Sequence, residues 1–234
     1  MSIAENIAKV RERMNAAARR AGRDPGAITL MAVTKTVPAE LVREAYGAGI
    51  RVFGENRVQE FAEKHEALQD LADTAWHMIG HLQTNKASRA VTLFSAVDSV
   101  DSVKLADKLN AVASASCKKI QVLIEVNIAG ETAKSGVAPQ SGELERLLQS
   151  APLWPNLTFS GLMAVPPLSA NPEAARPYFR SLRALQEQIA GRRFPSIQMN
   201  VLSMGMSHDF EIAIEEGSNC VRVGTAIFGE RLRD

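Results

Sequence analysis

Residues 30–38 are Leu-Met-Ala-Val-Thr-Lys-Thr-Val-Pro, a short apolar run that ends in a single lysine. The four apolar residues predict a fully buried strand over 30–33, and Pro38 prevents further strand pairing or opens a helix. Alternation along a strand places Met31, Val33 and Lys35 on one face, so an ammonium follows two core side chains. Lys35 therefore either covers apolar surface with its stem and keeps its charge in water, or is placed there to react.

Short apolar runs and helical segments alternate along the rest of the chain. Ser2 and Glu5 have the spacing of a capping box, and apolar residues then recur at helical spacing up to Gly22, which predicts a leading amphipathic helix. Further helices are predicted over 38–46, 58–71, 82–90, 100–115, 143–149, 173–189 and 210–216. Predicted strands cover residues 30–33, 50–53, 75–79, 93–97, 120–126, 157–165, 198–202 and 221–223.

This alternation predicts the fold class. Strands separated by helices require crossover connections and form a parallel sheet. Eight such units in a chain of 234 residues favour an α/β fold with one closed (β/α)8 barrel, an extra N-terminal helix and a single domain over 1–234. The alternative is an open Rossmann-like sheet. Against it, no GxGxxG follows the first strand, where Thr-Lys-Thr stands instead.

Composition limits the kind of partner. The formal net charge is +1 and the charges are interspersed, so neither nucleic acid nor an anionic membrane is expected as a partner. The two cysteines, Cys117 and Cys220, have no metal-ligand spacing and form no disulfide framework, which fits a reducing cytoplasm. The charged N-terminus lacks the apolar core of a signal peptide. Because no long apolar helix face asks for burial, we expect a monomer.

Polar residues collect where the predicted strands end. In a barrel these positions share one rim, where function is built. The residues are Lys35, Glu55, Asn56, His81, Asp98, Asn127, those from Ser203 to Ser207, Gly224 and Thr225.

Two of these segments are suited to an anion. Residues 203–209, Ser-Met-Gly-Met-Ser-His-Asp, combine a glycine with small hydroxyl residues just before a helix. The alternative is that Ser207 or Asp209 only caps that helix. Gly224 and Thr225 repeat the arrangement after the last strand, and barrels often bind phosphate through the loops after strands seven and eight. Arg222 points into the barrel on the side of Gly224, where it needs either a carboxylate such as Glu125 or a ligand atom.

A lysine amine, a phosphate site and an arginine in one apolar mouth suggest a phosphorylated aldehyde held as a Schiff base. Two ligand classes fit these groups, pyridoxal 5'-phosphate (PLP) and a sugar phosphate in an aldolase-like reaction.

Several blocks resemble the pyridoxal phosphate homeostasis protein family over almost the whole chain. They are residues 32–38, 53–60, 77–86, 161–163, 203–207 and 222–225. The resemblance implies a barrel similar to the N-terminal domain of alanine racemase. It also implies Lys35 as the Schiff-base lysine, Arg222 facing the pyridine nitrogen, and phosphate contacts from Ser203, Gly224 and Thr225. Asn56 and Met204 are assigned near the ring.

The residues favour cofactor storage and delivery over catalysis. Arginine stays cationic, so opposite the pyridine nitrogen it disfavours protonation and weakens the ring as an electron sink. The resemblance implies the same role, an intracellular PLP carrier whose partners are PLP and the apo-enzymes that receive it. The alternatives are a PLP-dependent amino-acid racemase, a Schiff-base aldolase, and a purely structural barrel without a ligand.

Overall fold

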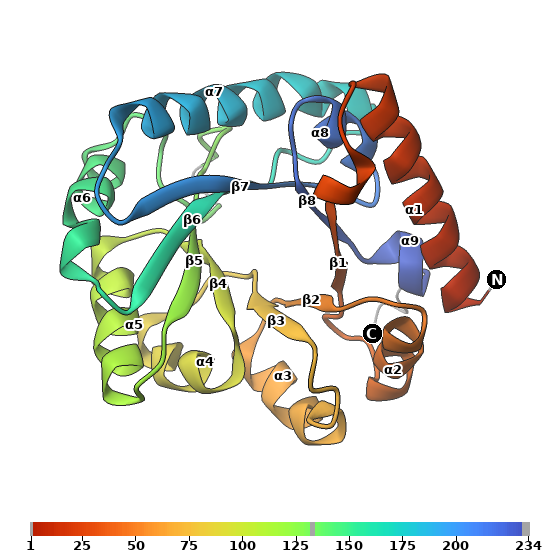
Figure 1. Ribbon diagram of the computed structural model, residues 1–234, viewed down its shortest axis with the longest axis horizontal. Coiled ribbons are helices and arrows are strands. Elements are labelled where there is room, and N and C mark those ends of the chain that lie inside the picture. The colour runs from red at the N-terminus through yellow and green to blue at the C-terminus, as the bar shows by residue number, and fades with distance from the viewer. Residues whose placement is uncertain (1, 132–133, 231–234) are drawn as a thin grey trace.

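The computed structural model describes residues 2–131 and 134–230 and places its strands in one closed parallel barrel, ordered β1 to β8 (Figure 1). The strands are β1 Thr29–Val33, β2 Val52–Glu55, β3 Ala75–Met78, β4 Ala96–Val100, β5 Ile120–Glu125, β6 Leu157–Met163, β7 Ile197–Met206 and β8 Cys220–Val223. Pairing of β1 with β8 closes the sheet, with Met31 opposite Arg222. The predicted barrel is therefore confirmed, and the open sheet is excluded.

Helices surround the barrel and follow the strands in turn (Figure 1). They are α1 Ile3–Arg20, α2 Ala39–Gly47, α3 Val58–His65, α4 Ala87–Leu93, α5 Val103–Ala115, α6 Gly142–Ser150, α7 Arg176–Arg192, α8 Phe210–Glu215 and α9 Thr225–Phe228. Short 3-10 turns are η1 Pro25–Ala27, η2 Glu66–Leu68, η3 Thr84–Lys86, η4 Ala151–Leu153 and η5 Pro172–Ala175. No helix within 2–131 and 134–230 is long and apolar enough to cross a membrane.

The extra N-terminal helix begins as predicted. The Ser2 hydroxyl accepts from the Glu5 backbone N–H at 3.2 Å, and the Glu5 carboxylate accepts from the Ser2 N–H at 2.9 Å. The buried face of α1 carries Ile7, Val10 and Met14 and packs against α8 and α9. Amphipathic spacing and the capping box thus place α1 over the end of the chain.

One face of each strand packs against the surrounding helices, and the other faces the barrel interior. In β1, Leu30 and Ala32 pack in the apolar layer between the sheet and the helices. Met31 and Val33 face the barrel interior, where there is little room. A Cβ on Gly54 of β2 would lie 2.8 Å from the Met31 sulfur. A side chain at position 54 would therefore require the Met31 and Ile79 side chains to shift.

The predicted strand over 93–97 is displaced in the structure. α4 continues to Leu93, and β4 begins at Ala96. The apolar pair Leu93-Phe94 belongs to the end of α4, where the Phe94 ring packs 4.9 Å from that of Phe61. A short apolar run is compatible with either a strand or a buried helix end, and tertiary packing selects the helix end here.

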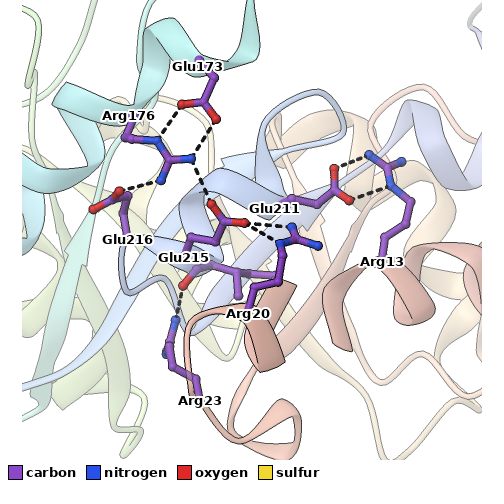
Figure 2. Close-up of polar contacts among 9 residues, drawn as sticks. Arg13, Arg20, Arg23, Glu173, Arg176, Glu211, Glu215 and Glu216 are labelled. Atoms are coloured by element: carbon purple, nitrogen blue, oxygen red, sulfur yellow. Dashed lines mark hydrogen bonds and ion pairs between the residues drawn. The ribbon is translucent and has the colours of Figure 1, made fainter. Parts of the chain in front are cut away.

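Arginines from α1 and α7 hold α8 in place (Figure 2). Arg176 at the start of α7 pairs with Glu215 at 2.9 Å and with Glu216 at 2.6 Å. From α1, Arg20 pairs with Glu215 and Arg13 with Glu211, each at 2.8 Å. Since α8 follows the polar segment 203–209 directly, this network anchors the back of one wall of the barrel mouth.

We expect Arg176→Met to lower the free energy of unfolding by about 1 kcal/mol, because its guanidinium joins the carboxylates of Glu173, Glu215 and Glu216 in a network. The measurement is urea unfolding. Arg183→Met on the same helix is the matched control, since among the described residues Arg183 forms one ion pair, with exposed Glu187, and it should cost measurably less. Equal losses in the two variants would contradict a special role for the network.

Candidate functional site

A cavity of about 360 Å³ opens at the carboxyl ends of the strands. Its walls combine apolar side chains with a lysine, an arginine and hydroxyl groups. The lining residues are Val33, Lys35, Asn56, Ile79, Val165, Leu168, Met206, Ser207, His208, Arg222, Gly224 and Thr225. We call it the Lys35 cavity. It brings together five of the seven predicted site residues.

Lys35 lies in the turn that follows β1 and is half-buried. Its side chain lines the same cavity as that of Val33, as strand alternation predicts. The turn itself is conformationally unusual, because Thr36 has a φ of +60°. The backbone N–H of Thr36 donates to the Glu60 carboxylate of α3. The position of the lysine is therefore set by groups on the neighbouring helix.

A second group on α3 that holds the Lys35 turn is the Lys64 ammonium. Its ammonium donates to the carbonyl of Thr34 at 2.6 Å and to that of Val37 at 3.3 Å, the carbonyls on either side of the Lys35 turn. It also pairs at 2.7 Å with Glu55, whose carboxylate is fully buried. Lys64 thus ties the turn to α3 and β2 at once.

The sequence placed Glu55 after the second predicted strand and therefore on the rim. The structure does not place it there. It is the last residue of β2, and its side chain faces Lys64 on α3. The Thr34 hydroxyl donates to the same carboxylate at 2.5 Å. Burial raises the pKa of Glu55 above its ordinary value even though Lys64 and Thr34 oppose that shift. The cause of the misplacement is that β2 extends two residues beyond the predicted end.

We expect Lys64→Met to cost about 3 kcal/mol of unfolding free energy at neutral pH, because it leaves a buried carboxylate without its cation. Protonation of Glu55 relieves that cost. Since the folded-state pKa of Glu55 is already raised and rises further in the variant, the deficit shrinks as pH falls. Urea unfolding between pH 7 and about pH 5 measures it.

Lys118→Met is the matched control for this prediction. The Lys118 ammonium donates to the carbonyls of Val91 and Thr92, each at 3.1 Å. Its removal should produce a smaller loss that does not change with pH over the same interval. A pH-independent deficit in Lys64→Met would contradict the role assigned to Glu55.

The opposite wall of the Lys35 cavity is formed by the segments after β7 and β8. The Ser207 hydroxyl accepts from the backbone N–H groups of Gly224 and Ala226, each at 3.2 Å. Ser207 therefore joins the two predicted anion segments and does not cap α8. Asp209 precedes α8 and accepts from the Met206 N–H at 2.6 Å, without a side-chain cap bond to that helix.

The backbone of this wall requires a glycine. Gly205 has a φ of +94°, and a Cβ there would lie 2.5 Å from the Cβ of Ala213 on α8. Any other residue would be strained and would push the 203–209 segment off α8. Close packing of the segment on α8 thus fixes where Ser207 points.

Arg222 lies within the barrel and is almost completely buried. One terminal nitrogen donates at 2.7 Å to both the carbonyl and the hydroxyl of Ser203, and the other donates at 2.8 Å to the carbonyl of Ala164. Within the described residues no carboxylate lies within ion-pair distance of Arg222, so the pairing with Glu125 that was considered above is not formed. Burial lowers the pKa of Arg222, and arginine side chains keep their charge in proteins.

Two predicted site residues do not line the cavity. Ser203 is fully buried, and its hydroxyl is engaged with Arg222. Met204 points the other way and packs in the apolar layer between the sheet and the helices. The alternation of β7 explains the difference, because adjacent residues of a strand face opposite sides. Their assignment as ligand contacts stays a prediction.

Asp98 differs from its expected place as well. It lies inside β4, where it is fully buried, and not after the strand. His77 of β3 contacts its carboxylate through Nδ1 at 3.0 Å. Burial disfavours the imidazolium, but the charge and hydrogen bonds of Asp98 outweigh this and raise the pKa of His77. The displaced start of β4 is the reason that the sequence placed Asp98 on the rim.

The sequence missed the part of the site that depends on contacts across elements. Lys64 on α3 carried no signal, because a lysine in an amphipathic helix is ordinarily solvated. Ser207 was noted in its motif, and only the pairing of the two anion segments distinguishes it from a helix cap. Leu168 in the loop after β6 is 88% exposed yet lines the cavity. That loop is long and apolar, which was its only signal.

Comparisons with a family model and with individual relatives agree on the family of this chain. The family model for the alanine racemase N-terminal domain matches residues 2–232. A pyridoxal phosphate homeostasis protein of Aquifex aeolicus is 46% identical over 231 residues, which cover 99% of each chain. One from Escherichia coli K12 is 42% identical over 231 residues, covering 98% of this chain and 97% of the relative. The chain belongs to the pyridoxal phosphate homeostasis protein family.

A solved structure extends this result to three dimensions. The structure of PipY from Synechococcus elongatus PCC7942, described with PLP bound, is similar with a TM-score of 0.85 and 35% identity, and the match covers 97% of this chain and 100% of PipY. The resemblance inferred from the sequence blocks is thus confirmed. PipY therefore has the same fold as the barrel described here.

Proposed function

We propose that the chain binds PLP in the Lys35 cavity and serves to hold and release this cofactor. The observation that carries the proposal is the arrangement of one cavity. A lysine amine lies on one wall, the Ser207 hydroxyl with the Gly224 N–H on the other, and the Arg222 guanidinium is buried between them. PipY, which is described with PLP bound, supports the assignment, as do the names of the other relatives.

The residues present fit the cofactor. PLP carries an aldehyde, a phosphate and a pyridine nitrogen, and its aldehyde condenses with a lysine amine with loss of water. Lys35 supplies the amine. Gly224, Thr225 and Ser207 supply backbone and hydroxyl groups for the phosphate, and Asn56 reaches the cavity from the end of β2. Ser203 and Met204 remain predicted contacts, although neither lines the cavity.

Arg222 argues for a carrier over an enzyme. Its terminal nitrogens are held by the Ala164 and Ser203 carbonyls, so the guanidinium has a fixed place in the barrel. A permanent cation opposite the pyridine nitrogen disfavours protonation of the ring and so weakens the ring as an electron sink for a carbanion. We further infer that the protein acts as a monomer and delivers PLP to apo-enzymes.

We expect wild-type protein incubated with PLP to gain a visible absorbance band that borohydride removes while trapping the cofactor on Lys35. Lys35→Ala should show neither effect, because no other lysine lines the cavity as described. Absorbance and peptide mapping by mass spectrometry measure both. Lys108→Ala on α5 is the control and should behave as the wild type.

A trapped cofactor on another lysine, or no band in either protein, would overturn this proposal. Amino-acid racemisation assayed on the loaded wild type separates the two remaining functions. Trapping on Lys35 without racemisation is the result that we expect, and turnover would make the protein an enzyme.

The phosphate assignment has a separate test. We expect Ser207→Ala to weaken PLP binding about tenfold, because a hydrogen bond to a charged group is lost. Pyridoxal, which lacks the phosphate, should bind the variant and the wild type equally. Equilibrium dialysis of both ligands measures the difference, and an equal effect on PLP and pyridoxal would contradict the assignment. Ser203→Ala in the same assay decides whether the buried serine also contacts the phosphate.

A further inference from the structure

The turn that carries Lys35 has a defined type. The Val37 N–H donates to the Thr34 carbonyl at 3.0 Å, so residues 34–37 form a β-turn with Lys35 in its second position and Thr36 in its third. Thr36 has a φ of +60°, whereas the φ of Lys35 is negative. A positive φ at the third position alone is the mark of a type II turn. The Lys35 turn is therefore of type II.

Threonine is a poor residue for the third position of such a turn. Glycine or asparagine usually stands there, because a Cβ in the left-handed region crowds the following carbonyl. A side chain branched at Cβ adopts this region rarely. The other non-glycine residues with a positive φ in the described chain are Cys117, Arg193 and Ser196, and none of them lines the Lys35 cavity. Contacts from outside the turn must therefore hold Thr36 in this conformation.

The competing conformation is a type I turn, in which the third residue has a φ of about −90°, a value that threonine adopts without strain. The two types differ by rotation of the central peptide, which here joins Lys35 to Thr36. In the type II form, the N–H of this peptide donates to the Glu60 carboxylate of α3. In the type I form, the Lys35 carbonyl would face that carboxylate instead. Since a hydrogen bond to a charged acceptor is strong, Glu60 selects the type II form.

Lys64, one helical turn further along α3, does not make this selection. Its ammonium binds the carbonyls of Thr34 and Val37, and both belong to peptides that do not rotate between the two types. The Lys64 ammonium lies 3.9 Å from the Glu60 carboxylate. Among the described contacts from α3, Lys64 thus holds the ends of the turn and Glu60 holds its middle.

We propose that Glu60 is a positioning residue for Lys35, because it holds the Lys35–Thr36 peptide in the form that directs the lysine side chain into the Lys35 cavity. Rotation of this peptide changes the ψ of Lys35 by about 150°. The rotamers open to a side chain depend on the φ and ψ of its own residue, so the path of the amine changes with the turn type. The use of this orientation for PLP rests on the proposed function, but the orientation itself belongs to the chain without PLP.

The experiment measures the reactivity of the Lys35 amine without the cofactor. PLP-free, full-length protein is incubated with propionaldehyde and cyanoborohydride. The aldehyde condenses with an amine with loss of water, and the hydride reduces the C=N bond to a stable secondary amine that peptide mapping by mass spectrometry locates. We expect Glu60→Met to slow modification of Lys35 about tenfold, because a misplaced amine loses rate steeply. Equal rates in this variant and the wild type would overturn the proposal.

A second substitution tests whether the conformation of Thr36 is the cause. Glycine adopts a positive φ without strain, so Glu60→Met combined with Thr36→Gly should return the rate of Lys35 modification to within about twofold of the wild type. Damage to α3 would not be repaired by a glycine in the turn, and a double variant as slow as Glu60→Met would overturn the proposal. Glu60→Gln keeps an oxygen that accepts the Thr36 N–H and should react faster than Glu60→Met. Equal slowing by both would assign the effect to charge and contradict the role of the hydrogen bond.

Glu63→Met is the matched control on the same helix. Glu63 is exposed, and its carboxylate forms no ion pair or hydrogen bond among the residues described, so Lys35 should react at the wild-type rate. Should Glu60→Met fail to fold, the wild type still decides the matter by NMR. A type II turn brings the Lys35 Hα close to the Thr36 N–H and gives a strong nuclear Overhauser effect between them. A weak one would show a type I turn and overturn the proposal.

PLP trapping, measured in parallel, separates this proposal from the previous one. We expect Glu60→Met to slow trapping of PLP on Lys35 as it slows the reaction with propionaldehyde. A wild type that traps no PLP, while its Lys35 reacts with propionaldehyde in the pattern given above, would overturn the proposed function and leave the role of Glu60 intact. A wild type that traps PLP on Lys35 at the same rate as Glu60→Met would overturn the role of Glu60 and leave the proposed function intact.

Discussion

The hydrogen-bonded pairing of β1 with β8 is the constraint on which the rest of this structure depends. It joins the first and last strands of the barrel and sets Met31 opposite Arg222. Lys35 follows the first of these strands, and Gly224 follows the second. Closure of the sheet therefore brings an amine from one end of the chain to the anion-binding segments of the other. In an open sheet the two would lie on opposite edges.

Three buried charged side chains, Arg222, Glu55 and Glu125, lie around this arrangement. Each has a different set of hydrogen-bond partners. Arg222 donates to backbone carbonyls and a serine, so its charge is hydrogen-bonded without a carboxylate partner. Glu55 is paired with Lys64, which in turn holds the carbonyls around Lys35. Among the described residues, Glu55 and Glu125 each keep one buried carboxylate oxygen without a hydrogen-bond partner, and Glu125 has no cation paired with its other oxygen, which accepts from Ser135. The first two arrangements orient the walls of the Lys35 cavity, and the third leaves a buried acceptor beside it.

Much of the fold could be predicted because its signals are local. The capping box of Ser2 and Glu5 and the helical spacing of Ile7, Val10 and Met14 act within one helix, and α1 forms as expected. Strand ends were less predictable. The misplaced starts and ends of β2 and β4 moved Glu55 to the helix-facing side of the sheet and Asp98 into the barrel. Because β2 and β4 both continue past their predicted ends, Glu55 and Asp98 lie within strands and face the environment that strand alternation gives them, and neither lies in the loop that follows.

By itself, the sequence determined the alternation of strands and helices, the closed barrel, and the lysine, arginine and glycine that meet at its mouth. These follow from the periodicity of apolar residues and from the chemistry of individual side chains, and both can be read from the amino-acid sequence. Only the tertiary structure decided that Ser207 joins the two anion segments, that Lys64 holds the Lys35 turn, and that the Glu125 side chain is buried, with one carboxylate oxygen unpaired among the described residues. Each of these is a distance between atoms on different elements, and packing sets such distances.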